Sequence, residues 1–236
     1  MIPPVLLYHK IDAPTADVKI RGAFTAPKTF ERQMVYLKKR GWTFLHATEL
    51  LRRFAEERRF PEKSIAITFD DGWKDNYIHA FPVLTKLKIK ATVFLVPSCV
   101  GEMTDRVTAE GEGPREHLSV DEIRDMAENG VEFGSHGMNH LLMDRIGDST
   151  ARSEIHDSKR AIEDLLQRPC TAFAYPAGFF TDSAKRFAED AGYLGAFTTV
   201  FGDKDDPEMF ALNRLEILRR DGRPFQFGRK LRTLAG

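Results

Sequence analysis

The sequence predicts a single α/β domain whose parallel sheet is either open or closed into a barrel. Segments typical of strands alternate with segments typical of helices along the 236 residues, an order that favours parallel strands joined by right-handed crossovers. Polar side chains follow the ends of several predicted strands, and in α/β barrels these carboxyl ends form the active-site face. No internal repeat and no linker with a shift in composition divides the chain, so we expect one domain over residues 1–236.

Composition and charge indicate an ordinary globular protein. Apolar residues make up 42% of the chain and charged residues 30%, which is usual for soluble domains. The 35 basic and 35 acidic side chains cancel, so the net charge attracts neither nucleic acid nor an anionic membrane. The two cysteines, Cys99 and Cys170, offer no disulfide framework. We find no leader-like segment and no apolar run of about 20 residues, so we expect no membrane span and a cytoplasmic location.

Short apolar runs rich in β-branched and aromatic residues predict the strands. The clearest is Ser64–Phe69, which leads directly into two adjacent carboxylates and a glycine. The predicted strands are Val5–Tyr8, Trp42–Leu45, Ser64–Phe69, Ala91–Val96, Val131–Phe133, Ala172–Tyr175, Leu194–Thr198 and Leu212–Leu218.

Apolar residues at helical spacing, together with capping residues, predict the helices. Thr48 is a candidate N-cap, Ser119 begins a capping box with Glu122, and Ile78 lies on the apolar side of a helix that Pro82 is expected to kink. The segment Pro97–His117 has no sustained period, and we interpret it as a surface loop that shapes the substrate site. The predicted helices are Pro27–Arg40, Thr48–Arg58, Asn76–Leu87, Ser119–Asn129, Thr150–Gln167, Thr181–Asp190 and Phe225–Leu231.

Two histidines and a carboxylate form a candidate metal site. His136 and His140 are four residues apart, the spacing that places two imidazoles on one face of a helical turn. Asp71 completes a set of two nitrogens and one oxygen, which leaves an open position for water and suits zinc, with cobalt, nickel or iron as alternatives. Gly137 stands where a zinc protease has its glutamate, so we reject the protease interpretation. Asp70 is then left to act as general base.

These residues also resemble the motifs of a known family. The segment Thr68–Gly72, followed about sixty residues later by Ser135–His140, resembles the polysaccharide deacetylases of carbohydrate esterase family 4, and Ala174–Gly178 is similar to that family's third motif. The resemblance runs from about Val5 to Leu218. It implies a distorted (β/α)7 barrel of the NodB type and metal-dependent removal of an acetyl group from an N- or O-acetylated sugar.

The resemblance also implies roles for individual residues. The family's general base corresponds to Asp70, and its metal ligands correspond to Asp71, His136 and His140. The main-chain N–H that binds the oxyanion corresponds to that of Ala177.

The chain departs from the family pattern at several positions. Many members carry an arginine at the position of Ala174 that tethers the base, and Arg214 is our candidate substitute. The family's fourth motif is not recognisable, and the histidine of its fifth motif, the general acid, is missing from Glu216–Gly222. The pair Tyr8-His9 resembles the N-terminal Tyr-His of poly-N-acetylglucosamine deacetylases. We therefore predict that His9 protonates the leaving amine.

Two other functions stay open at this point. The altered third motif and the missing fourth keep open an amide hydrolase acting on a formamide or a cyclic ureide. A non-catalytic carbohydrate-binding module is the third hypothesis, which the presence of Asp70 weakens. The expected partner is a carbohydrate substrate, with no nucleic acid and no prediction of oligomeric state.

The remaining aromatic and histidine side chains receive no firm role. Tyr175, Phe179 and Phe180 either line a sugar site or belong to the core. We assign no function to His46, His79, His117 and His156.

Overall fold

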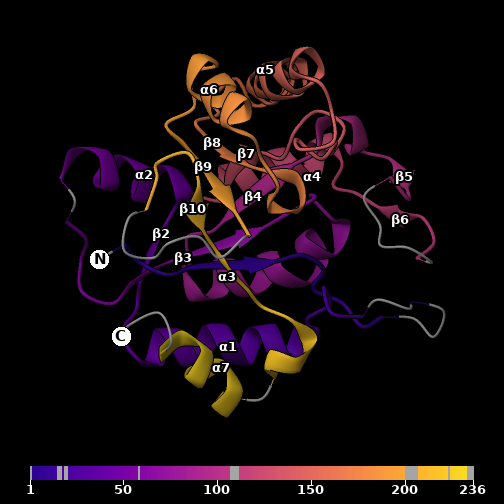
Figure 1. Ribbon diagram of the computed structural model, residues 1–236. Coiled ribbons are helices and arrows are strands. Elements are labelled where there is room, and N and C mark those ends of the chain that lie inside the picture. Colours follow the sequence, from indigo (N-terminus) through magenta and orange to yellow (C-terminus); the bar gives the residue numbers. More distant parts are fainter. Residues whose placement is uncertain are drawn as a thin grey trace.

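The computed structural model is a nearly closed barrel of parallel strands with helices around it (Figure 1). It describes residues 2–14, 18, 21–57, 59–106, 112–199, 207–222 and 224–232. Within these residues the main sheet has nine strands, and every neighbouring pair in it is parallel. They are β1 (Val5–Tyr8), β2 (Thr43–Leu45), β3 (Ser64–Phe69), β4 (Thr92–Leu95), β7 (Glu132–Ser135), β8 (Ala172–Ala174), β9 (Gly195–Thr198), β10 (Leu212–Asn213) and β11 (Leu215–Glu216).

The last strand closes the barrel in two pieces. β10 pairs with β9 at one edge of the sheet, and β11 pairs with β1 at the other. Only Arg214 lies between these two pieces, so a single chain segment joins both edges. β10 and β11 count as one broken strand, and β2 pairs only with the first half of β3 and takes no separate position in the barrel. Counted in this way, the described barrel has seven strand positions. This confirms the predicted distorted (β/α)7 architecture.

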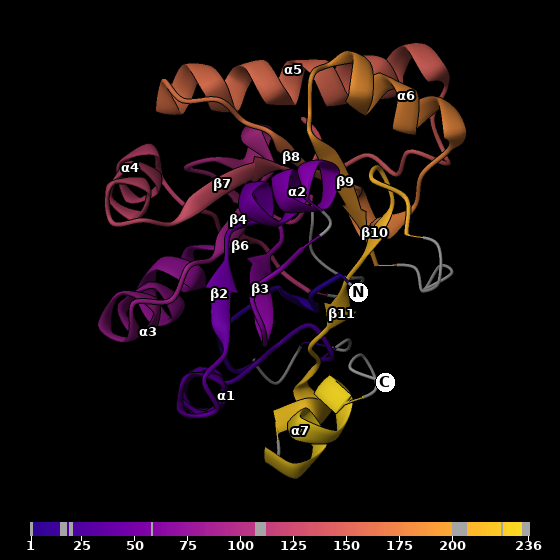
Figure 2. The same cartoon turned by 90° about the vertical axis from the view of Figure 1, so that its left-hand side faces the viewer.

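Most helices lie around the outside of the barrel, whereas α2 lies across the strands in the view of Figure 2. Helices α5 and α6 lie together along one side, and α1 and α7 lie on the opposite side with α3 and α4 between them (Figures 1 and 2). No helix among the described residues is long and apolar enough to cross a membrane. The helices are α1 (Pro27–Lys39), α2 (Ala47–Glu56), α3 (Phe81–Leu87), α4 (Val120–Glu128), α5 (Asp148–Leu166), α6 (Asp182–Asp190) and α7 (Pro224–Arg232).

Alternation along the strands produces two hydrophobic cores. In β3, Ile65 and Phe69 belong to the core between the barrel and its outer helices, because successive side chains of a strand point to opposite faces. Ala66 belongs instead to a second core, inside the barrel, which α2 shares through Leu50 and Leu51. The same alternation continues past the strand end and directs Asp70 inward.

The helix predicted over Asn76–Leu87 begins as a π-helical turn, η1 (Asn76–Ala80), before α3. The N–H of Phe81 bonds the carbonyl of Asn76, one residue further back than in an α-helix. A π-turn inserts a residue and rotates the following face. Ile78 is therefore 51% exposed, and its predicted inward position was wrong.

The two predicted helix N-termini had different outcomes. Thr48 is not an N-cap: His46 precedes α2, and the Thr48 hydroxyl bonds that of Thr171 instead. The predicted end of this helix at Arg58 lies outside the described residues. The capping box of α4 is confirmed, with Ser119 and Glu122 bonded reciprocally.

The predicted surface loop over Pro97–His117 contains regular structure. It begins with the short helix η2 (Pro97–Cys99) and includes an antiparallel pair, β5 (Met103–Thr104) and β6 (Arg115–Glu116). The prediction of a surface loop did not include this short helix and strand pair, because pairing between segments about ten residues apart leaves no local period.

Close packing inside the barrel predicts that Gly134 in β7 tolerates no side chain. A Cβ atom there would lie 2.6 Å from the Phe94 ring and 2.8 Å from the Ala172 carbonyl oxygen. We expect Gly134→Ala to lower the free energy of unfolding by about 1–3 kcal/mol, as overpacked cores do. Urea unfolding measures this, with Gly113→Ala as control because a Cβ there meets nothing within 4 Å. Equal stability of the two variants would contradict the expectation.

Candidate active site

Asp70 and Arg214 form a buried ion pair inside the barrel. Arg214 Nη1 lies 2.7 Å from Asp70 Oδ1, and Nη2 lies 2.6 Å from Oδ2, so the contact is bidentate. Both residues are 2% exposed. The guanidinium also packs 5.3 Å from the centre of the Phe94 ring. The structure thus places the predicted tether and the predicted base in direct contact.

This pairing decides the protonation of Asp70. Burial raises the pKa of the carboxyl, but the charge of Arg214 and its two hydrogen bonds outweigh burial and lower the pKa to about 2. Asp70 is therefore ionised at neutral pH.

A tight turn after β3 directs Asp71 toward the same space. Asp71 and Gly72 both have positive φ, 74° and 72°, a conformation that is costly for a residue other than glycine. The indole N–H of Trp73 donates to Asp71 Oδ2 at 2.9 Å. The other oxygen, Oδ1, is buried and has no hydrogen-bond partner among the described residues.

Two imidazoles face that unpartnered oxygen. His136 Nε2 lies 3.6 Å from Asp71 Oδ1, and His140 Nε2 lies 3.4 Å from it. His136 Nδ1 is 2.7 Å from the carbonyl oxygen of Ala174. Since a carbonyl can only accept, Nδ1 carries the proton and Nε2 presents its lone pair to the cluster.

The cluster fits a divalent metal. One ligand atom from each of Asp71, His136 and His140 lies within 4.8 Å of the others. A buried carboxylate oxygen without a partner is costly unless a cation or donor compensates it. Burial lowers the pKa of His140 to about 4, so this imidazole is neutral at pH 7, as a metal ligand must be. Two nitrogens and one oxygen suit zinc with an open position.

The predicted helical turn over His136–His140 is absent, and these residues form an irregular loop. Gly137 and His140 have positive φ, 78° and 60°. Buried Glu154 of α5 holds the loop, accepting from the Asn139 main-chain N–H at 2.8 Å and from its side-chain amide at 2.6 Å. The two histidines converge because α5 fixes this loop, and the helical reason given for their spacing was wrong.

His9 and Ala177 lie at strand ends, as predicted. His9 directly follows β1, and its Nδ1 is 3.9 Å from Glu216 Oε1 and makes no hydrogen bond to the residues that the structure describes. Ala177 follows β8 in the short helix η3 (Pro176–Gly178), is exposed and has a φ of 52°. The roles of both residues stay predictions.

Three neighbours of the site were missed by sequence reasoning. Trp73 and Glu154 hold a candidate ligand and the ligand loop, as described above. His117, to which no role was assigned, packs against Trp73 and contacts the Asp71 main chain. Only Trp73, two residues after Asp71, has a local sequence signal; the other two approach from distant segments.

The aromatic residues after β8 divide between core and surface. Tyr175 is fully buried, and its hydroxyl donates to the Phe210 carbonyl. Phe180 is partly buried against the core, whereas Phe179 is 46% exposed.

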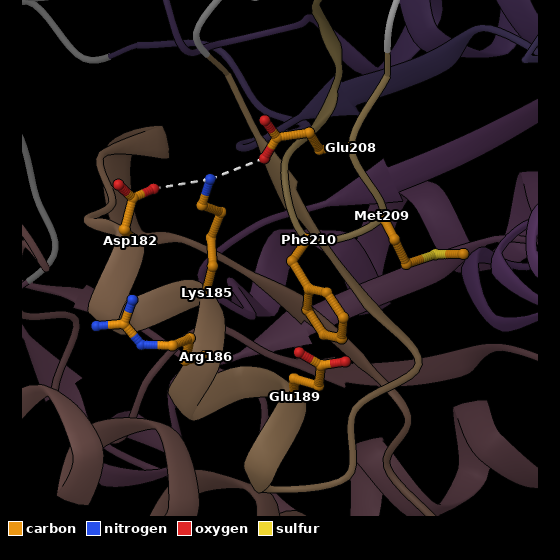
Figure 3. A pocket seen from close by; sticks show the side chains of 7 residues that line it. All are labelled: Asp182, Lys185, Arg186, Glu189, Glu208, Met209 and Phe210. Atoms are coloured by element: carbon orange, nitrogen blue, oxygen red, sulfur yellow. Dashed lines mark hydrogen bonds and ion pairs between the residues drawn. The ribbon is translucent and has the colours of Figure 1, made fainter.

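A separate groove lies along α6 and shares no residue with this cluster (Figure 3). It encloses about 360 Å³. Lys185 lies between Asp182 and Glu208 at 2.8 Å from each carboxylate (Figure 3). Because this ammonium is paired with a carboxylate on both sides, Lys185 offers no unpaired charge to a ligand in the groove.

A barrel with a candidate metal site and a separate ionised carboxylate at the carboxyl ends of its strands is typical of a hydrolase. The family model described as polysaccharide deacetylase matches residues 57–196. YxkH of Bacillus subtilis (strain 168), whose name assigns it to the polysaccharide deacetylases, is 30% identical over 216 residues, covering 91% of this chain and 71% of that protein. The chain belongs to the polysaccharide deacetylase family.

Other members of the family are similar over most of the chain. A poly-beta-1,6-N-acetyl-D-glucosamine N-deacetylase of Staphylococcus aureus (strain MRSA252) is 26% identical over 189 residues, 76% of this chain and 62% of that protein. The deacetylase PplD of Streptococcus pyogenes, solved in complex with acetate, superimposes with a TM-score of 0.83 at 25% identity over 97% of both chains. The family resemblance inferred from the motifs is thus confirmed.

The ion pair predicts an acid-sensitive stability. The pKa of Asp70 is lowered from 3.8 to about 2 on folding, so its contribution is present above the unfolded pKa and is lost as the pH falls through the folded pKa. We expect the metal-free protein to lose about 2 kcal/mol more stability between pH 5 and pH 2 than Asp70→Asn. Urea unfolding across this range measures the difference. Parallel pH profiles would show that the pair contributes nothing to acid sensitivity.

Proposed function

We propose that this protein is a divalent-metal-dependent deacetylase that removes the acetyl group from an N-acetylated sugar or glycoconjugate. The observation that carries the proposal is the cluster of Asp71, His136 and His140 next to a second, ionised carboxylate. Binding alone would need no such second carboxylate. Membership of the polysaccharide deacetylase family supports the reaction class.

The three clustered residues would hold the metal, which supplies Lewis acidity and lowers the pKa of a bound water. Asp70 accepts the proton of the attacking water, and Arg214 keeps this carboxylate ionised and oriented. Asp70 Oδ2 is the oxygen directed to the cluster, since it lies 3.5 Å from His136 Nε2.

Two further residues serve the remaining steps in this proposal. The main-chain N–H of Ala177 donates a hydrogen bond to the oxyanion that forms on the acetyl carbonyl. His9 then donates a proton to the departing sugar nitrogen. The position of both residues at the carboxyl ends of strands next to the cluster supports these roles.

A β-1,6-linked N-acetylglucosamine oligomer is the first substrate to test, because it corresponds to the activity named for the Staphylococcus aureus relative. The acetate bound to PplD is the product expected of acetyl removal and supports the same chemistry. Release of formate or ammonia from a formamide or a cyclic ureide, without acetate from any N-acetylated sugar, would favour the alternative amide hydrolase.

Metal removal and two substitutions test the mechanism. We expect chelation to abolish acetate release and added zinc or cobalt to restore it. Asp70→Asn should retain the metal but lose about 10²–10⁴-fold in turnover, whereas His136→Ala should lose both metal and turnover. Elemental analysis and an acetate assay measure the two properties, and His156→Ala, a change on α5 outside the cluster, is the control. Full activity of the metal-stripped protein would refute the mechanism.

A further inference from the structure

His117 lies next to the turn that carries Asp71, directly after the second strand of the β5–β6 pair. It is 3% exposed. Its main-chain N–H donates to the Glu102 carbonyl at 3.0 Å, and the next N–H, of Leu118, donates to the Gly72 carbonyl at 2.9 Å. The hairpin is thus fastened directly to the turn that carries Asp71.

The His117 side chain makes two contacts there. Its Nδ1 lies 3.1 Å from the main-chain carbonyl oxygen of Asp71, so Nδ1 carries the proton and donates. Its ring centre lies 4.2 Å from that of Trp73, with 33° between the planes. Its Nε2 is buried and has no hydrogen-bond partner in the described part of the chain, so the described hydrogen bond of this ring is directed at Asp71.

Trp73 fixes the carboxylate of Asp71. Its indole N–H holds Asp71 Oδ2, which leaves Oδ1 for the cluster. The indole is itself fixed by Lys10, whose ammonium lies 4.5 Å from the ring centre and 2.8 Å from buried Glu112. The His117–Trp73 pair therefore holds Asp71 both by its main chain and by its carboxylate.

We propose that His117 is a positioning residue for Asp71, which acts by holding the main chain of this metal ligand in its left-handed conformation and by orienting the indole that fixes its carboxylate. The proposal rests on the metal dependence of the proposed function. A positive φ at Asp71 persists only where the surroundings impose it. Without the His117 hydrogen bond, the Asp71 main chain can relax and Oδ1 leaves the position shared with the two imidazoles.

Two substitutions separate the hydrogen bond from the ring contact. His117→Asn keeps an N–H donor near the position of Nδ1 and removes the ring, whereas His117→Phe keeps a ring against Trp73 and removes the donor. His156→Phe is the matched control on α5. For each variant we would measure zinc affinity by competition with a chelator, the absorption spectrum of the cobalt-substituted protein, and the melting temperature of the metal-free protein.

We expect His117→Phe to bind zinc about 10–100-fold more weakly, the range found for residues that orient metal ligands, and to change the cobalt spectrum. His117→Asn should recover most of the affinity, and the control should match wild type. Wild-type affinity and spectrum in His117→Phe would overturn the proposal. So would equal losses in both variants that parallel equal falls in melting temperature, since a purely structural role gives that result.

The wild-type measurement separates this inference from the proposed function. If the wild-type protein binds no zinc or cobalt, the proposed function and the inference both fail. If it binds metal and His117→Phe binds equally well, only the role of His117 is refuted. If it binds metal but releases no acetate from any substrate, the deacetylase proposal fails, while the affinities still decide the role of His117.

Discussion

The ion pair between Asp70 and Arg214 is the interaction on which both the barrel and the site depend. Two buried charges are tolerated only when they are paired and well bonded, and the bidentate contact meets this condition. Arg214 is also the residue at which the last strand breaks, and its Nε lies 3.4 Å from the Thr198 carbonyl oxygen of β9. The Arg214 side chain therefore contacts β9 beside the break in the last strand and also holds the carboxylate of the site.

The adjacent carboxylates coexist because the backbone and their partners separate them. In a continued strand, Asp70 and Asp71 would point to opposite faces of the sheet. The left-handed turn at Asp71 and Gly72 brings both into the same space. There Asp70 is neutralised by Arg214, and Asp71 is held by Trp73 with one oxygen left for a cation. The two neighbouring carboxylates thus have different surroundings, and different surroundings allow them to take different chemical roles.

Sequence reasoning predicted the parts of this site that local patterns encode. The predicted strand before Asp70 agrees with the structure. Arg214 was chosen as the tether because the family's arginine was missing and Arg214 lay in the predicted last strand, and the structure places it in contact with Asp70. The loop of His136 and His140 was predicted as a helical turn, since its conformation is set by Glu154 from another element. His117 reaches the site through a hairpin, and contacts between distant segments leave no periodic signal.

The strength of the ion pair has a consequence for the proposed proton transfer. A carboxylate with a pKa of about 2 is a weak base, and efficient general bases have a pKa nearer the working pH. Protonation of Asp70 would replace its ion pair with Arg214 by a buried, uncompensated guanidinium, an unfavourable state. Under the proposed function, Asp70 therefore holds the proton only briefly, and restoring the ion pair favours its onward transfer. In that scheme Arg214 makes Asp70 a transient proton carrier, and His9 is the group proposed to deliver a proton to the leaving nitrogen.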